Sequence, residues 1–220
     1  KAGFAFAGWT PSIHGVCPEE DATYTARWKT GTGATAANVA DVIAALDGAG
    51  PHTLVLTGEI SSQTITDIKN AMIANTDAMI HVDMEASYGI TSLYSYPGFQ
   101  DCTNLTSIVI PETVTYLPDN VFNGCTGLVS VTLPDAVSRI TNQQAGTPRG
   151  TPFSFCPNLE EIHIGEGNET YTVVDNVVYT KDMKKLVAYP AGKKDTAYTL
   201  PATVEEIGHY AMDGNTYLSS

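Results

Sequence analysis

The chain has 220 residues, a hydrophobic content of 43% and a formal net charge of −13, with 24 acidic against 11 basic side chains. This hydrophobic content is ordinary for a folded chain, while the excess of negative charge argues against partners such as nucleic acid or anionic lipid. No apolar run approaches the roughly 20 residues of a membrane-spanning helix, so we expect no direct membrane insertion by this chain.

Residues 1–29 combine closely spaced aromatic residues with turn residues, which predicts a small β-rich unit. Its aromatic positions include Phe4, Phe6, Trp9, Tyr24 and Trp28. Small residues fill 30–37 (TGTGATAA), a composition typical of a flexible linker. The chain opens on Lys1 and stops within a repeat, so we expect both ends to continue in a longer protein. The absence of a signal peptide therefore says nothing about that protein.

Residues 38–82 are predicted to alternate two helices with two strands. Asn38 precedes the first apolar stripe at helical spacing, and a second stripe starts near Thr64. The stripes consist of Val39, Val42, Ile43 and Leu46, then of Ile65, Ile68, Met72 and Ile73. Strand-like stretches follow each stripe, at 53–59 and 78–85. Such a segment ahead of repeats is typical of an N-terminal cap that covers the end of a solenoid core.

One motif recurs between residues 83 and 220. Copies begin at Cys102 (CTNLTSIVIPETVTYL), Cys125 (CTGLVSVTLPDAVSRI) and Cys156 (CPNLEEIHI), and the second half returns from Thr199. Cys102 and Cys125 are 23 residues apart, and Cys125 and Cys156 are 31 apart. A fixed period in this range predicts a solenoid whose repeats bury a core by stacking. We therefore expect the protein to act through an extended surface and not through an enclosed catalytic pocket.

Within each copy the period-two alternation of a short strand separates buried from outward positions. In the first copy Leu105, Ile108 and Ile110 are expected in the core. The same register in all three copies gives a candidate partner-binding surface of six outward residues: Ser107, Val109, Ser130, Thr132, Glu161 and His163. A second buried pair is expected at Val114/Leu117, Val137/Ile140 and Val204/Ile207, and an aromatic residue or a methionine is expected to close each turn, at Phe99, Phe122, Phe153 and Met212.

Two insertions interrupt the period. Residues 141–152 are polar and contain glycine and proline, which predicts a surface loop. Residues 165–199 contain YTVVDNVVYT and KLVAYPAG, which predict an inserted β-meander. Insertions of this kind map to one face of a solenoid, often the binding face, and simple drift in repeat length is the alternative.

Residues that carry chemistry are sparse, and we expect no catalytic, cofactor-binding or metal-binding residues. Cys102, Cys125 and Cys156 share one repeat position that Asn215 fills in the fourth copy, which indicates a packing slot and not a metal site. His14 and Cys17 lack an orienting partner, and Cys17 is expected to be a free thiol. The acidic run Glu19, Glu20 and Asp21 is expected to be a solvated loop. His81 and His163 lie beside acidic residues, which favours surface pairs, with a pH-sensitive contact as the alternative.

The pattern CxxLxxIxIPxxVxxIxxxxF over residues 83–220 resembles the BspA-like, or Treponema pallidum-type, leucine-rich repeats. The Gly3-Phe4, Gly8-Trp9 and Tyr24-x-Ala26-x-Trp28 positions resemble the end of a Listeria–Bacteroides repeat. The resemblance implies an α+β, β-rich fold: a leucine-rich-repeat solenoid with an α/β N-terminal cap and an inserted β-meander.

The same resemblance implies a non-enzymatic bacterial cell-surface or secreted domain that mediates adhesion to host or other bacterial cells. Its partner would be a host matrix or bacterial surface protein, or alternatively a glycan. Two other roles stay open from the sequence: a structural spacer or stalk, and an ancillary domain of a larger secreted enzyme.

Overall fold

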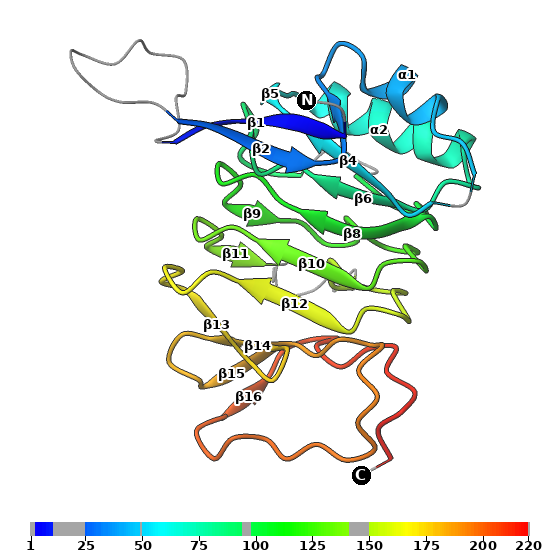
Figure 1. Cartoon of the computed structure of the whole chain (residues 1–220). Helices are drawn as coiled ribbons and strands as arrows, with labels where there is room; N and C mark the ends of the chain where they lie inside the picture. The colour runs from blue at the N-terminus through cyan, green and yellow to red at the C-terminus, as the bar shows by residue number, and fades with distance from the viewer. Residues whose placement is uncertain (1–2, 11–24, 49, 94–97, 141–149, 220) are drawn as a thin grey trace, which may run out of the picture.

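The computed structural model describes residues 3–10, 25–48, 50–93, 98–140 and 150–219. In this part of the chain short strands lie one below another and form an elongated stack (Figure 1). Two helices lie at the end that holds the N-terminus, and a small separate sheet lies at the end that holds the C-terminus. The β-rich α+β architecture expected from the sequence is confirmed.

Six parallel strands form the main sheet in the order β12-β10-β8-β6-β4-β3. They are β3 (Thr32–Ala34), β4 (His52–Leu56), β6 (Ile80–Asp83), β8 (Leu105–Val109), β10 (Ser130–Leu133) and β12 (Glu161–Ile164). Ile108, Val131 and Ile162 are in register across three neighbouring strands. Alternate side chains of a strand point to opposite faces, and these three all point to the inner face, where they are buried as the repeat predicted.

A second column of short parallel strands runs beside the main sheet. It pairs β5 (Gly58–Glu59) with β7 (Ser87–Tyr88), and β9 (Tyr116–Leu117) with β11 (Arg139–Ile140). Three buried rings, Phe99, Phe122 and Phe153, stack between successive repeats with centroids 5.8 and 6.1 Å apart. Equivalent positions of neighbouring repeats thus touch directly, which is how a solenoid closes its core.

The repeated cysteines are buried, unpaired and part of this core. The Cys125 thiol donates to the Phe99 carbonyl and the Cys156 thiol to the Phe122 carbonyl, each at 3.0 Å. In the fourth copy the Asn215 side-chain amide donates to the carbonyls of Ala191 and Lys193 at 3.0 and 2.9 Å. A cysteine and an asparagine therefore have the same structural role in this position, because each donates a hydrogen bond to a backbone carbonyl of the preceding turn.

The N-terminal part supplies the helices α1 (Val39–Ala44) and α2 (Ser62–Ala74). Ser61 precedes α2, and its hydroxyl accepts the Thr64 N–H at 3.4 Å, which caps the first turn. Ile65, Ile68 and Met72 are buried as predicted, but Ile73 is 45% exposed. Successive helical residues differ by about 100° in direction, so the position after Met72 turns away from the core.

The segment 30–37, expected to be a flexible linker, contains the edge strand β3. Thr32–Ala34 pairs in parallel with β4 through the partners Thr32↔Leu54 and Ala34↔Leu56. Small residues suit a linker, but they also fit an edge strand on which another segment packs closely. At Gly33 the segment 3–10 packs on β3, and a Cβ on Gly33 would lie only 3.3 Å from the Cβ of Ala5. Composition alone could not distinguish these two uses.

The insertion 165–199 forms an antiparallel meander, as the sequence predicts. Its strands are β13 (Tyr171–Val174), β14 (Val177–Thr180) and β15 (Lys185–Ala188), and β15 then pairs in parallel with β16 (Glu206–Ile207). The expected burial of Ile207 is wrong, since its side chain is 49% exposed. β16 is the outermost strand of this four-stranded sheet, so no described repeat packs on Ile207.

Residues 3–10 and 25–30 form an antiparallel hairpin of β1 (Phe4–Thr10) and β2 (Thr25–Thr30). The hairpin crosses the main sheet near β4 (Figure 1). Ala5 and Ala7 face the sheet and form a small buried cluster with Val55 of β4. Phe4, Phe6, Trp9 and Trp28 are exposed, so the two faces of the hairpin differ sharply in side-chain size.

Candidate interaction surface

The outward side chains of the main sheet form two rows that cross the strands. The first row contains Thr53, His81, Ser107, Ser130 and Glu161, and the second contains Val55, Asp83, Val109, Thr132 and His163. Each step along a row is one pair of neighbouring parallel strands, which lie about 4.8 Å apart. The six residues predicted as the surface occupy adjacent places in these rows, on β8, β10 and β12. We call these six residues the strand face.

The strand face becomes more exposed toward β12. Ser107, Val109, Ser130 and Thr132 are half-buried, whereas Glu161 and His163 on the outermost strand are exposed. The imidazole Nε2 of His163 lies 3.0 Å from Oε2 of Glu161, with side chains 51% and 50% exposed. A pair this exposed contributes little to stability, and both groups remain available to a partner.

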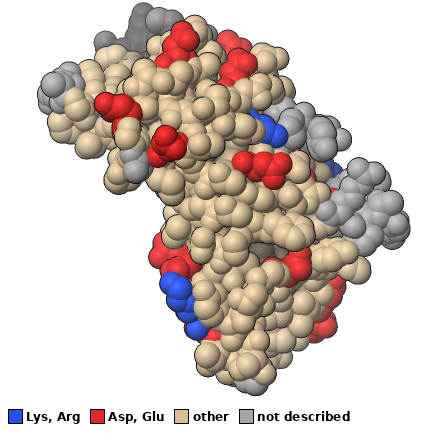
Figure 2. Space-filling model, turned by 90° about the vertical axis from the view of Figure 1, so that its right-hand side faces the viewer, with Lys and Arg blue, Asp and Glu red and all other residues tan. Residues whose placement is uncertain are grey.

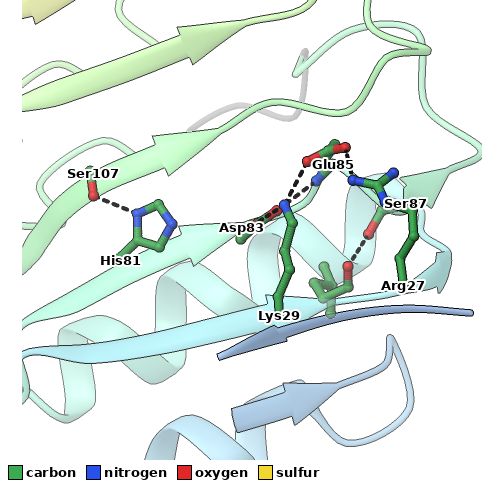
Figure 3. A network of polar contacts seen from close by, with 8 residues as sticks. Arg27, Lys29, His81, Asp83, Glu85, Ser87 and Ser107 are labelled. Atoms are coloured by element: carbon green, nitrogen blue, oxygen red, sulfur yellow. Dashed lines mark hydrogen bonds and ion pairs between the residues drawn. The ribbon is translucent and has the colours of Figure 1, made fainter. Parts of the chain in front are cut away.

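The sequence-based selection omitted His81 and Asp83, which continue the two rows onto β6. The alternation of His81, Val82 and Asp83 would have placed them on the same face. The imidazole of His81 contacts the Ser107 hydroxyl, so this row is already linked by hydrogen bonding (Figure 3). Burial lowers the pKa of His81 despite the neighbouring Asp83 carboxylate, which favours its neutral form.

A set of ion pairs ends the open part of the face at β6. The Lys29 ammonium on β2 reaches across to the carboxylates of Asp83 and Glu85, and Arg27 pairs with Glu85 (Figure 3). Asp83 is consequently only 5% exposed. Beyond it, the hairpin covers Val55. The hairpin therefore closes the second row at Asp83 and Val55, whereas His81 and the strand face remain accessible.

The charges of this network depend on one another. Burial lowers the pKa of Lys29, but hydrogen bonds to Asp83 and Glu85 outweigh burial, so its net pKa is raised. Burial raises the pKa of Glu85, yet hydrogen bonds from Lys29 and Arg27 bring its net pKa below the ordinary value. Both shifts favour the charged forms, which keeps the hairpin attached to the sheet.

The described residues offer no metal-binding cluster and no exposed cysteine thiol on this surface. Among the described residues, no group of three His, Cys, Asp or Glu side chains could hold a metal ion. Burial raises the pKa of Cys102 and of Cys156 to about 12, so these thiols stay protonated and serve packing. His14, Cys17, the acidic run 19–21 and most of the loop 141–152 lie outside the described residues.

The described part of the chain contains no helix with both the length and the apolar character needed to cross a bilayer. Acidic side chains are spread over the face in Figure 2, while basic side chains appear at few places. This distribution agrees with the scattered acidic residues of the sequence.

Solved structures of bacterial leucine-rich repeat proteins are similar to this chain. A leucine rich cell surface protein from Faecalibacterium prausnitzii has a TM-score of 0.51 at 22% identity, over 76% of this chain and 47% of its own. A leucine-rich repeat protein from Eubacterium ventriosum has a TM-score of 0.41 at 19% identity, over 74% and 52%. The pneumococcal vaccine antigen PcpA has a TM-score of 0.44 at 17% identity, over 76% of this chain and 43% of its own. The chain spans about half the length of these proteins, and the first similarity shows a shared fold.

A comparison with curated protein sequences finds no significant match. The family described as BspA type leucine rich repeat region (6 copies), by contrast, matches residues 56–145 and 98–185. The two segments together extend over more than half of the 220 residues and contain the repeat copies that begin at Cys102, Cys125 and Cys156. The stacked parallel strands agree with this match, and the chain therefore belongs to the BspA-type leucine-rich repeat family.

Proposed function

We propose that this chain is a non-enzymatic protein-binding domain of a bacterial cell-surface or secreted protein, and that it serves adhesion to host or other bacterial cells. The observation that carries the proposal is the strand face, where three successive strands present paired outward side chains in register. Repeat solenoids offer such regular surfaces to protein partners. The similar structure from F. prausnitzii is that of a leucine rich cell surface protein, which supports the proposed location.

The chemistry of the strand face fits a protein partner of moderate affinity. Ser107, Ser130 and Thr132 have short side chains that lose little rotamer freedom when they are covered. Their hydroxyls both donate and accept hydrogen bonds. Glu161 and His163 add charge at the exposed edge, where it can orient a partner. A partly polar surface of this kind is typical of interfaces whose two partners also exist separately.

A pull-down with the whole chain, against immobilised matrix proteins, bacterial surface proteins and glycans, tests this proposal. Thr132→Arg places a long charged side chain in the middle of the strand face and should weaken retention about tenfold or more. Thr126→Arg in the same repeat is the matched control, because Thr126 is exposed and lies outside the face.

Retention by a protein partner that Thr132→Arg abolishes and Thr126→Arg preserves supports the proposal. Equal loss in both variants would place the contact elsewhere. No retention across the whole panel would refute adhesion and favour a spacer role. The proposed relation of the β1–β2 hairpin to a Listeria–Bacteroides repeat is a separate proposal that this experiment does not address.

A further inference from the structure

A pocket opens where the β1–β2 hairpin meets the segments that follow β4, β6 and β8. We call it the hairpin pocket, and its volume is about 240 Å³. Its principal side chains are Phe6, Trp9, Arg27, Glu85, Tyr88 and Glu112. The aromatic rings of the pocket come mainly from the hairpin and its carboxylates from the repeat turns. This site is separate from the strand face, so the inference below stands independently of the proposed function.

The aromatic side of the pocket is exposed and has a defined geometry. Phe6 contacts Trp9 and Trp28 edge-on, with ring centroids 5.4 and 5.6 Å apart and ring planes at 70° and 71°. Rings held perpendicular to one another leave part of their faces uncovered, and Trp9 is 41% exposed. The negative face of an indole attracts cations that lie within about 6 Å of its centroid.

The opposite side of the pocket carries more negative charge than the chain itself neutralises. Glu85 pairs with Arg27 and with Lys29, each at 2.5 Å, and the Arg27 pair shows that a guanidinium fits beside the Glu85 carboxylate. No basic side chain among the described residues pairs with Glu112. Burial, together with the nearby charges of Asp135 and Glu85, raises the pKa of Glu112 by more than a backbone hydrogen bond from Asp135 lowers it. The carboxylate therefore sits in a negative field that a cation would relieve.

We propose that the hairpin pocket binds a single lysine or arginine side chain of a partner protein, between the ring of Trp9 and the carboxylate of Glu112. The pocket is smaller than the about 300–1,000 Å³ of sites for drug-sized ligands, which suits one protruding side chain. The net charge of −13 favours approach of a basic segment and opposes a second copy of this chain.

Short peptides test the inference directly. The probes are acetyl-Ala-Lys-Ala-amide, its arginine analogue and a norleucine analogue with an uncharged side chain. The chain has two tryptophans, Trp9 and Trp28, and both lie in the hairpin, so intrinsic fluorescence reports binding there. The lysine and arginine peptides should change the fluorescence in a saturable way at millimolar concentration or below, and the norleucine peptide should not.

Two variants locate the contact. Glu112→Gln removes one charge with little change in shape and should weaken binding about fivefold or more. Glu166→Gln is the matched control, because it removes the same charge from an exposed residue after β12, outside the pocket. Trp9→Leu should weaken binding by a smaller factor, measured by calorimetry.

Three results would overturn the inference: no saturable response at millimolar peptide, equal binding of the norleucine peptide, or equal effects of Glu112→Gln and Glu166→Gln. None of them would affect the strand face, because the Thr132→Arg experiment concerns different residues.

Discussion

Asn168 holds the start of the inserted meander against the preceding repeat, and its replacement by alanine should destabilise the chain strongly. The side chain is 1% exposed. Its amide group donates to the carbonyls of Asp135 and Val137 at 2.9 and 2.7 Å. Its carbonyl accepts the N–H groups of Thr170 and Tyr171 at 2.9 and 2.7 Å. One side chain thus satisfies four backbone groups on two segments.

The size of the effect follows from how many of these groups water can reach. The bonds to Val137 and Tyr171 are buried, while those to Asp135 and Thr170 are partly buried. A buried polar group that loses its partner costs about 1–3 kcal/mol, and a partly accessible one costs less because water replaces the bond. We expect Asn168→Ala to lower the free energy of unfolding by about 3–5 kcal/mol. That is a large fraction of the about 5–15 kcal/mol of a whole domain.

Urea unfolding followed by far-UV circular dichroism measures this loss, as a lower midpoint with an unchanged slope. The control is Asn158→Ala, which removes one exposed bond of 2.7 Å to the Thr126 carbonyl. Its cost should stay below about 1 kcal/mol. The reasoning fails if Asn168→Ala costs less than about 1 kcal/mol, or no more than Asn158→Ala.

Three further predictions concern the core, a strained turn and the hairpin. Phe122→Ala should lower the free energy of unfolding by about 3–5 kcal/mol, measured by urea unfolding, because the ring packs between two others. Phe155→Gly should raise the melting temperature, because it removes about 1–2 kcal/mol of backbone strain. Phe155 has a left-handed φ of 57°, and the equivalent position of the preceding copy is Gly124. Glu85, whose pKa is lowered on folding, should contribute to the free energy of unfolding above pH 4.5, and this contribution should vanish as the pH falls through the pKa of Glu85 in the folded chain. Lys29, whose pKa is raised on folding, should contribute to the free energy of unfolding below pH 10.5, and this contribution should vanish as the pH rises through the pKa of Lys29 in the folded chain. Tryptophan fluorescence of the hairpin against pH measures both.

Each of these predictions has a contrary outcome. A cost for Phe122→Ala below about 1 kcal/mol would mean that the ring stack is not part of the stable core. A lower melting temperature for Phe155→Gly would mean that the exposed ring, 70% accessible, makes a contact worth more than its backbone strain. Hairpin fluorescence that is constant between acidic and alkaline pH would show that the ion pairs do not hold the hairpin in place.

Local pattern was sufficient for the repeats. Period-two alternation separates Ile108 from Ser107, and the shared spacing of the three cysteines defines one slot in each turn. Both features depend on residues close in sequence, so they can be predicted without knowledge of the rest of the chain. The meander at 165–199 was predictable for the same reason.

Contacts between distant segments were not predictable in this way. Lys29 and Asp83 are 54 residues apart, and nothing in either neighbourhood indicates that they meet. The exposure of Ile207 depends on its place at the edge of a sheet, which is a property of the assembled stack.

By itself, then, the sequence determined the repeat, its register and the six residues of the strand face, because a strand's alternation decides which side each residue takes. Only the tertiary structure decided how far that face stays open. The β1–β2 hairpin covers Val55, Lys29 neutralises Asp83, and the same docking creates the hairpin pocket. The physical reason is that burial and ion pairing at the hairpin arise from segments which only folding brings together.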